Sequence, residues 1–462
     1  MIGRLRAVAA QKRIAEDLVG NTEPLELAGI LIDLELADAI PSISTTDEDG
    51  YRRRQAWLVV RLFTEPIGLV VLDLPGKGLD AADVLTQVIE RCGRQLTQRL
   101  VPLGLGTQSL STSGVTYTGI PPFVSSRAAV LADAPACTAV VCTRERPDVL
   151  RRALESVAAQ RYPQFQVLVV DNAPRNDETR RVVEGFESRL SVRYTVEPRP
   201  GLSRARNHAL RQVTTPLIAW LDDDEEADVF WLAELARGFH AHPAAAAVSG
   251  VVVPGAVDSI VQVWFEQFGG HSKGRGFVSD VFSARTHARQ SPLYPLPPFG
   301  VGANMAFRTD ALRDVGGFDE ALGAGTLTKG GEDTKVFTQL LRSSATIVYQ
   351  PSALVRHFHR ADLPGLREQL EGYGTGLTAF YTALIVDDPS VLWPLVKLAP
   401  RAILDLMSTN SPRVATLGKD FPTDLLAVNR RAMLVGPVRY LSERFRRGTQ
   451  RAVVSATARA PS

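Results

Sequence analysis

The most informative pattern in this chain is an uninterrupted apolar run that ends in five consecutive carboxylates. The run covers residues 217–221 and follows Pro216, and the acids occupy residues 222–226. Five apolar residues in a row, bounded by a proline, are typical of a buried central strand. Open α/β sheets bind ligands at the carboxyl ends of such strands. The pattern therefore predicts a ligand-binding sheet edge at the acids.

Strand-like and helix-like segments alternate along the middle of the chain. Short apolar runs predict strands, and apolar positions three or four residues apart predict helices. The predicted strands cover 138–142, 165–170, 192–196 and 217–221, and the helices between them cover 147–160, 178–188 and 202–212. This order is typical of a doubly wound parallel sheet, that is, a Rossmann-like α/β fold.

The first hundred residues predict a separate α+β unit. Residues 55–63 and 67–73 are strand-like, and the turn signal at 64–66 between them indicates a hairpin. Asp80 then begins a helix with one apolar face. We find no catalytic constellation in residues 1–103, and we therefore expect an accessory domain with a packing or interaction role.

The segments on either side of the expected catalytic domain, residues 137–362, differ from it in composition. Residues 104–136 are rich in Gly, Ser, Thr and Pro and show no sustained period, which predicts a linker. Residues 363–462 have a helical, amphipathic pattern, with eight arginines and one glutamate after Asn429. A basic amphipathic segment is typical of a membrane-surface contact. A helical cap on the catalytic domain with a disordered tail is the equal alternative.

Composition narrows the class of protein. With 45% hydrophobic and 22% charged residues and a net charge of +2, the chain is an ordinary globular protein, with no overall field that points to nucleic acid. Its three cysteines form neither a disulfide framework nor a zinc pattern. The first twenty residues carry charges where a signal peptide needs an apolar core, and no apolar stretch is long enough to span a bilayer. We expect a cytoplasmic protein, with the C-terminal region as the candidate contact to the inner membrane face.

The consecutive acids themselves predict a cation. Two unit charges about 4 Å apart repel by roughly 4 kcal/mol at an effective dielectric near 20, and a divalent ion removes that repulsion. Oxygen ligands suit hard ions such as Mg²⁺ or Mn²⁺, which keep open positions for substrate phosphates. Acids are also common at helix N-termini, and residues 227–242 look helical, so a capping role is the alternative.

Polar side chains follow the other predicted strands as well. Thr143, Arg144 and Arg146 come after the first strand, and Asp171 comes after the second. A carboxylate such as Asp171 can accept from a nucleobase N–H, and Arg206 on the third helix can fork onto a diphosphate, although helix arginines usually lie on a solvated face. No Gly-x-Gly-x-x-Gly follows the first strand, which argues against NAD.

These motifs together resemble the inverting nucleotide-sugar glycosyltransferases of family 2, which have the GT-A fold. The resemblance covers residues 137–360, about half of the chain. It rests on the stretches 140–147, 169–172, 205–207, 222–224, 302–308, 316–319, 331–333 and 355–357. We therefore expect a GT-A-type, Rossmann-like sheet with an N-terminal α+β accessory domain and C-terminal helices.

The resemblance implies a nucleotide pocket that includes Thr143 and Asp171. The full set that we expect to bind the nucleotide is Thr143, Arg144, Arg146, Asp171, Arg206, Asp222 and Asp223. Many members have an aromatic residue and Asn directly after the Thr, whereas this chain has Arg144 and Glu145. The identity of the donor base is therefore open.

A metal site is also implied, in which the D-x-D carboxylates of Asp222 and Asp224 bind Mn²⁺ or Mg²⁺. His357 matches the family's histidine after a late strand, and we expect it to join them; a solvated loop histidine is the alternative. His359 lies two positions further on. On alternate positions next to a strand, we expect the two histidines to point opposite ways, so that only one joins the acids.

The resemblance places the catalytic base in the Glu332-Asp333 pair, and we expect Asp333 to act because it begins a helix after a glycine-rich segment. The Gln-x-x-Arg-Trp signature of processive synthases is absent after Asp333. We thus expect a non-processive, metal-dependent transfer, with inversion, from a nucleoside diphosphate sugar to a glycan, lipid-linked or small-molecule acceptor.

Two other functions remain open. A sugar nucleotidyltransferase also needs metal and has a similar sheet, but we find no glycine-rich triphosphate loop with its lysine. A catalytically silent nucleotide-sugar-binding or scaffold protein would use the N-terminal unit to recruit partners. The intact run of mutually repelling acids argues against a degenerate site.

Overall fold

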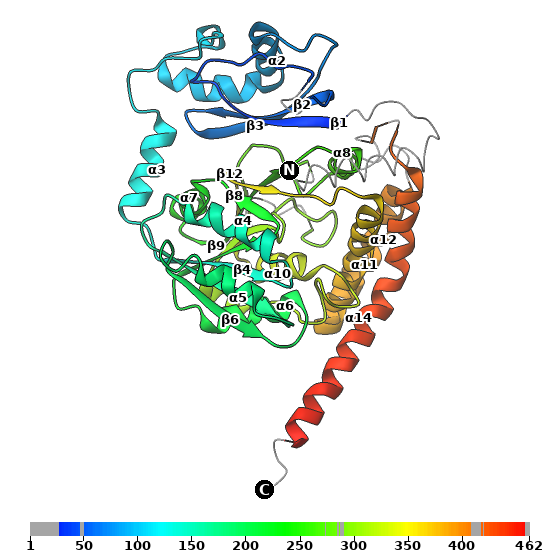
Figure 1. Ribbon diagram of the computed structural model, residues 1–462. Helices are drawn as coiled ribbons and strands as arrows, with labels where there is room; N and C mark the ends of the chain where they lie inside the picture. Colours follow the sequence, from blue (N-terminus) through cyan, green and yellow to red (C-terminus); the bar gives the residue numbers. More distant parts are fainter. Residues whose placement is uncertain are drawn as a thin grey trace.

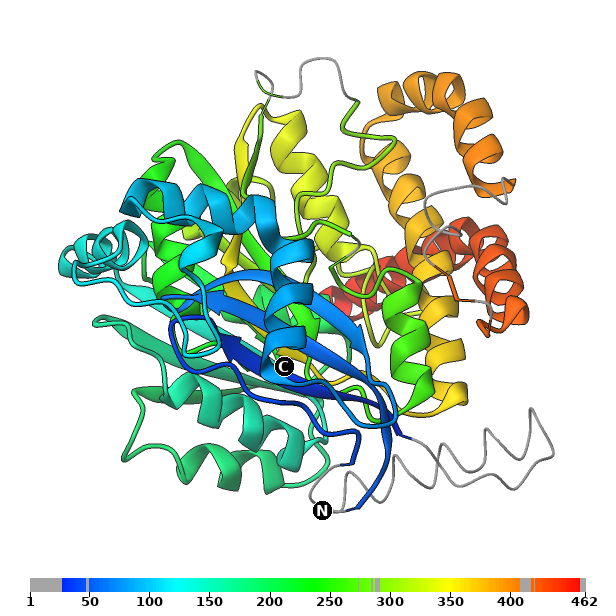
Figure 2. The same cartoon turned by 90° about the horizontal axis from the view of Figure 1, so that it is seen from above.

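The structure, a computed structural model, describes residues 27–46, 50–272, 274–283, 286, 291–407, 417–418 and 420–457. Three parts follow one another along the chain: a small α+β layer, a central α/β unit and a group of C-terminal helices (Figures 1 and 2). The α+β layer lies above the central unit in Figure 1, and the C-terminal helices lie along the right-hand side of that unit.

The N-terminal layer is a three-stranded sheet with one covering helix. Strands β1 (Leu27–Glu35) and β2 (Arg53–Leu62) pair in parallel, and β2 pairs antiparallel with β3 (Glu65–Asp73), so the predicted hairpin is confirmed. Helix α2 (Ala81–Leu100) buries its apolar face against one side of this sheet. The other side, with Trp57, packs on the central unit. Because both faces are buried, the strands are apolar almost throughout.

The segment at 104–136, in which the sequence shows no sustained period, contains helix α3 (Pro122–Ala132). The helix has no clear apolar period, and one of its two buried residues is an arginine. Arg127 lies 3.5 Å from the centre of the Phe230 ring and pairs with Glu234 at 3.5 Å. A cation on an aromatic ring is a favourable contact that no hydrophobic pattern reveals.

The central unit is built on one mixed sheet. Its strands are β4 (Cys137–Thr143), β5 (Phe165–Asn172), β6 (Val192–Glu197), β7 (Leu217–Asp222), β8 (Glu225–Ala227), β9 (Ala245–Pro254), β10 (Asp280–Phe282), β11 (Asn304–Arg308) and β12 (Thr346–His357). Their order is β10-β12-β9-β11-β7-β4-β5-β6, and β8 pairs with β12. Strands β4 to β7 pair in parallel as predicted. Beyond these four strands the sheet is mixed, because β11 runs antiparallel to β7 and β9.

Helices cover both faces of this sheet (Figure 1). The helices of the unit are α4 (Pro147–Ala158), α5 (Glu178–Glu184), α6 (Leu202–Gln212), α7 (Trp231–Ala241), α8 (Ile260–Gln267), α9 (Thr309–Asp314) and α10 (Glu332–Arg342). Neighbouring strand residues supply opposite faces: Val141 packs with α4 and α7, and Val140 packs with α6 and α10. This layering confirms the expected α/β class and leaves the carboxyl ends of β4, β5 and β7 at one edge.

The C-terminal part is helical, as its pattern predicted. Helices α11 (Leu363–Asp387) and α14 (Thr423–Thr457) pack side by side, and α12 (Leu392–Met407) follows α11. Among the helices in the described part of the chain, none is both long enough and apolar enough to cross a membrane. The end of the basic tail, including Arg459, lies outside the described residues. The short 3₁₀ helices are η1 (Val101–Leu103), η2 (Thr107–Ser109) and η3 (Pro389–Val391).

Candidate active site

The predicted acids form a turn between two strands of the sheet. Strand β7 ends at Asp222, and the chain reverses through Asp223 and Asp224 into β8, which pairs antiparallel with the end of β12. Helix α7 begins only at Trp231, so the alternative that these acids cap a helix is wrong. The acids lie at the carboxyl end of β7 beside β4, where the sequence placed the ligand-binding edge.

Arg146, which directly precedes helix α4, holds two of these acids. Its Nη2 lies 2.5 Å from Asp223 Oδ1, and its Nη1 lies 2.9 Å from Asp224 Oδ2. Thr143, the last residue of β4, donates its hydroxyl to Asp223 Oδ2 at 2.7 Å. Charge-assisted bonds of this kind fix the orientation of both carboxylates. The turn is therefore shaped by the residues that follow β4.

Arg206 is a buried cation that joins two parts of the site. Only 1% of Arg206 is exposed, so the solvated helix face that is usual for an arginine does not apply. Its Nη2 donates to Asp222 Oδ1 at 3.1 Å and to the Gly302 carbonyl at 3.3 Å, and its Nη1 donates to Glu332 Oε1 at 3.0 Å. The guanidinium thus links the end of β7 to the start of α10.

Burial makes most of the acids in this turn hard to ionise. It raises the pKa of Asp223 to about 7, although an arginine lies beside that carboxylate. Burial also raises the pKa of Glu225 well above its usual value; Glu225 Oε1 has no hydrogen-bond partner among the described residues. Burial opposes ionisation of Asp224 too, but His357 and Arg146 outweigh it and lower its pKa. Of these three acids, Asp224 ionises most readily.

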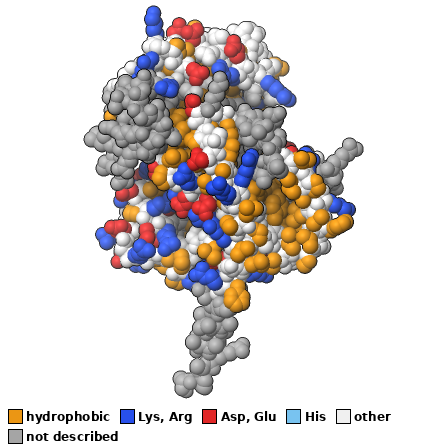
Figure 3. All heavy atoms as spheres, turned by 90° about the vertical axis from the view of Figure 1, so that its right-hand side faces the viewer, with side chains coloured by type: hydrophobic (Ala, Val, Ile, Leu, Met, Phe, Trp, Pro, Cys, Tyr) orange, Lys and Arg blue, Asp and Glu red, His pale blue; other side chains and the backbone are white. Residues whose placement is uncertain are grey.

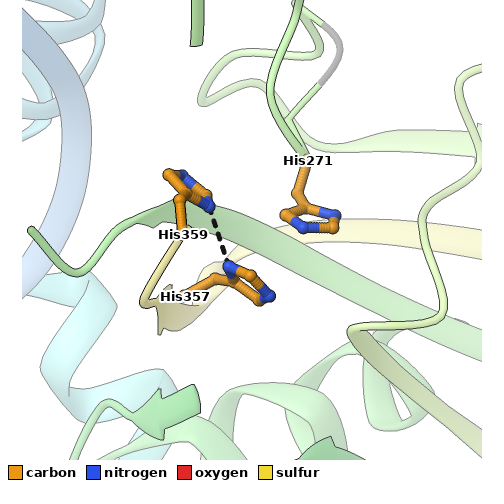
Figure 4. Close-up of side chains that lie close together, drawn as sticks. All are labelled: His271, His357 and His359. Carbon is orange, nitrogen blue, oxygen red and sulfur yellow. Dashed lines mark hydrogen bonds between the residues drawn. The ribbon is translucent and has the colours of Figure 1, made fainter. Parts of the chain in front are cut away.

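His357 lies beside Asp224 at the end of β12. Its Nε2 is 3.4 Å from Asp224 Oδ1, and its Nδ1 is 2.8 Å from Nδ1 of His359 (Figure 4). The expectation that the two histidines point opposite ways is wrong, because side chains two positions apart on an extended segment lie on the same face. Burial lowers the pKa of His357 to about 4, so the imidazole is neutral near pH 7 and can offer a lone pair.

Asp222, Asp224 and His357, the three expected metal ligands, do not lie together as one compact group of possible ligands. Within the described residues, the one group of three possible ligands whose atoms lie within 4.8 Å of one another is His271, His357 and His359. Asp224 and His357 face each other, whereas the carboxylate of Asp222 faces the buried arginine. The structure thus brings together two of the three expected metal ligands, one carboxylate and one imidazole.

Asp171 lies on the strand next to Thr143. The two residues are paired in register across β5 and β4. Asp171 is fully buried; its Oδ2 accepts from the Tyr194 hydroxyl at 2.8 Å, and its Oδ1 has no hydrogen-bond partner among the described residues. Burial raises the pKa of Asp171. Arg144, by contrast, is exposed in the turn after β4. Both residues lie at the edge that carries the acids.

Glu332 and Asp333 begin α10 in different surroundings, because neighbouring helix positions point about 100° apart around the axis. Glu332 is buried against Arg206, and burial together with the adjacent Asp333 charge raises its pKa to about 7. Asp333 is only partly buried; its Oδ2 accepts from the Gly302 N–H and its Oδ1 from the Thr334 N–H, each at 2.6 Å. Asp333 is therefore the more accessible of the two acids.

Several contributors to the site could not be found from the sequence. Tyr194, Glu266 and His271 stand alone in ordinary surroundings, and no spacing rule connects them to the motifs. Each reaches the site only through tertiary contacts: Tyr194 through β6, Glu266 through α8, and His271 by packing its ring 4.3 Å from that of His357.

Comparison with known proteins finds a family match over part of the chain. Residues 138–316 match the family model for glycosyl transferase family 2. Pre-mycofactocin glycosyltransferase of Mycobacterium tuberculosis is 28% identical over 228 residues, which are 49% of this chain and 43% of that protein. Succinoglycan biosynthesis protein ExoM of Rhizobium meliloti is 31% identical over 232 residues, which are 46% of this chain and 64% of that protein. The chain therefore spans less than two thirds of either relative.

A solved structure with a similar arrangement is the mannosyltransferase PcManGT from Pyrobaculum calidifontis, in complex with GDP-Man and Mn²⁺. It is 18% identical, and the match covers 73% of this chain and 84% of that one with a TM-score of 0.41. The family match and the mixed sheet with helices on both faces confirm the expected GT-A-type α/β fold. The chain thus carries a glycosyl transferase family 2 domain at residues 138–316.

Proposed function

We propose that this protein is a metal-dependent, inverting glycosyltransferase that moves single sugars from a nucleoside diphosphate donor to an acceptor hydroxyl. The observation that carries the proposal is the Asp224–His357 pair within a turn of buried carboxylates. Two arginines offset only part of the charge of this turn, and a divalent cation would offset the rest. The glycosyl transferase family 2 domain supports the reaction class.

The donor nucleotide would lie along the edge formed by β4, β5 and β7. Asp171 Oδ1 is a buried acceptor without a donor, which a nucleobase N–H would satisfy. Thr143, next to it in register, would line the same pocket. Arg146 is 49% exposed while it holds two acids, so its guanidinium has further N–H groups for a phosphate. Arg144 would contact the nucleotide from the exposed turn.

Asp224 and His357 would hold Mn²⁺ or Mg²⁺, and donor phosphate oxygens would take the open positions. A carboxylate next to a neutral imidazole suits Mn²⁺ well, because that ion accepts both oxygen and nitrogen ligands. The bound cation would neutralise charge that grows on the departing diphosphate. Asp222 would stay on Arg206 and keep the turn in place, as would Asp223 on Arg146.

Asp333 would remove the proton from the acceptor hydroxyl on the face opposite the leaving group. Its two oxygens are held by backbone N–H groups, and a carboxylate retains further lone pairs for an acceptor hydroxyl. Glu332 is buried and its Oε1 is already used by Arg206, so it is the less suitable base. With Asp333 as the base on that face, a single displacement would invert the anomeric configuration of the sugar.

Neither alternative function accounts for the site as well. A sugar nucleotidyltransferase would need groups that bind a triphosphate, and the family match over residues 138–316 is to transferases of sugars instead. A silent binding protein has no need for a partly exposed carboxylate at Asp333 or for a neutral imidazole beside Asp224. Product formation separates all three, since only the transferase releases a nucleoside diphosphate and glycosylates an acceptor.

We also infer that the C-terminal helices contact an anionic membrane surface. Apolar side chains on this side of the molecule are exposed and form a continuous region in Figure 3. The most exposed are Trp393, Ile403 and Leu404 on α12, and Leu434, Val438, Leu441 and Phe445 on α14. On α14 these positions recur every three or four residues, which puts them on one face. The exposed Arg430 and Arg431 lie on the same helix, and a lipid-linked acceptor would be reached at this surface.

A thermal-shift screen tests the proposed function directly. Nucleoside diphosphates and their sugars are added to the full chain with and without Mn²⁺, and a ligand stabilises the protein by RT ln(1 + [L]/Kd). We expect one nucleotide series to stabilise the protein only when Mn²⁺ is present. The stabilising donor then enters a transfer assay, and a product that retains the donor's anomeric configuration would contradict the single displacement.

A further inference from the structure

From His357, hydrogen bonds continue away from Asp224 through two more side chains, His359 and Glu266. His357 Nε2 lies 3.4 Å from Asp224 Oδ1, and its Nδ1 lies 2.8 Å from His359 Nδ1 (Figure 4). His359 Nε2 lies 2.6 Å from Oε1 of Glu266. Both imidazoles are buried, so water does not compete for these bonds. The series is carboxylate, imidazole, imidazole, carboxylate.

Helix α8 and its surroundings hold His359 and Glu266, the far end of this series of hydrogen bonds, in place. Gln262 donates to the His359 carbonyl at 3.1 Å, and the Phe265 ring lies 4.4 Å from the His359 ring. Gly270 leaves room for the carboxylate: a Cβ there would lie 2.6 Å from the oxygens of Glu266. Two contacts thus hold His359, and Gly270 leaves room for Glu266, independently of any cation.

The chemistry of the four groups decides which way each hydrogen bond points. An ionised carboxylate only accepts, so the N–H between Glu266 and His359 belongs to His359 Nε2. A neutral His359 then has Nδ1 as its acceptor, and His357 must donate through its own Nδ1. In a neutral His357 this leaves Nε2 without a proton and with its lone pair toward Asp224. Glu266 therefore sets the tautomer of a ring that it does not touch.

We propose that Glu266 and His359 are positioning residues that present the Nε2 lone pair of His357 to the divalent cation beside Asp224. This inference rests on the proposed cation site at Asp224 and His357. Outer partners of this kind orient metal-bound histidines in many proteins, and their loss typically costs about 10–100-fold in metal affinity. Here the outer partner acts through a second imidazole instead of contacting the ligand directly.

The tautomers can be read in the metal-free protein. With ¹⁵N-labelled imidazoles in the full chain, we expect the NMR signals of His357 to show a protonated Nδ1 and an unprotonated Nε2, and those of His359 to show the reverse. His357→Gln and His359→Gln identify the signals. Glu266→Gln should disturb this pattern, because an amide can donate to His359 and so reverse both bonds. A protonated Nε2 on His357 in the unaltered protein would overturn the proposal.

Metal affinity provides the second measurement. Mn²⁺ is titrated into the full chain, and the free ion is measured by electron paramagnetic resonance. We expect Glu266→Gln to weaken Mn²⁺ binding by about 10–100-fold, with a melting temperature close to that of the unaltered protein when no metal is present. Glu266→Asp keeps an obligate acceptor and should recover part of the affinity. Glu226→Gln is the matched control, because it removes the same charge from the acidic turn outside the hydrogen-bonded chain.

The outcomes separate this inference from the proposed function. If Asp224→Asn and His357→Gln bind Mn²⁺ as the unaltered protein does, the proposed cation site itself is wrong. If those two variants lose binding while Glu266→Gln stays within the range of Glu226→Gln, only the positioning role is wrong. Binding that survives Asp224→Asn but is lost in His359→Gln would place the metal among the three imidazoles of Figure 4 and would overturn the relay.

Discussion

Asp333→Asn tests the proposed base. Because Asp333 accepts two backbone hydrogen bonds, the substitution also lowers the stability of the protein, apart from its effect on catalysis. Both carboxylate oxygens accept backbone N–H groups at 2.6 Å, one from Gly302 and one from Thr334. Asparagine has one acceptor oxygen, so its NH₂ group must face one of these donors. Losing such a bond costs about 1–3 kcal/mol, and a domain of this size loses about 2–4 °C in melting temperature per kcal/mol.

The effect on turnover should be much larger than this structural cost. Loss of a general base lowers the rate by about 10²–10⁴-fold, and the donor should still bind, because the proton is taken only during transfer. The assay is the rate of nucleoside diphosphate release with acceptor present, at a temperature where the variant is fully folded. Glu332→Gln is the control, since it sits on the same helix turn but faces Arg206. If Asp333→Asn keeps more than about a tenth of the rate while it is folded, Asp333 is not the base.

Three further predictions follow from the site and the surface. Asp224→Ala should abolish Mn²⁺-dependent stabilisation by the donor in a thermal-shift assay and leave the metal-free protein folded; unchanged metal dependence would exclude this residue as a ligand. Arg206→Met should cost about 3–5 kcal/mol, because it leaves buried carboxylates without their cation. Burial already raises the pKa of Glu332 in the folded protein to about 7, above its unfolded value of 4.5. Ionisation of Glu332 therefore opposes folding increasingly as pH rises from about 4.5 to 7. Removing the Arg206 cation should raise the folded pKa further and extend this pH range upwards. The loss of melting temperature should therefore be greater at pH 8 than at pH 5.5, and an equal loss at both would refute the assignment. Leu434→Glu with Phe445→Glu, at positions 80% and 73% exposed, should reduce flotation with anionic liposomes at unchanged melting temperature; equal flotation would exclude this face as the contact.

Local pattern was enough to predict most of the elements that carry the site. The parallel core of β4 to β7 and the helices between these strands fall where apolar runs and helical spacing placed them, and α6 begins and ends at the predicted residues. The acids were expected at the carboxyl end of a buried strand, and β7 ends there. These predictions succeed because a strand that is buried on both faces is apolar at successive positions, and such a run is visible in the sequence.

Strand direction and the helix α3 could not be predicted in the same way. Strand β11 is apolar and short, and nothing in its five residues distinguishes a parallel from an antiparallel partner. Helix α3 depends on Arg127, whose contacts with Phe230 and Glu234 lie about a hundred residues further along the chain. Packing between distant segments decides both features, and periodicity does not report it.

The sequence by itself determined which side chains gather at the sheet edge, because strand ends are local features. Only the tertiary structure decided which partner each of those side chains contacts. Arg206 could have faced solvent or a diphosphate, but α6 packs it inside, where it bridges Asp222 and Glu332. His359 meets Glu266 across 93 positions of sequence. The physical reason is that a buried charge without a partner is costly, and the partner within reach is fixed by the packing of the whole domain.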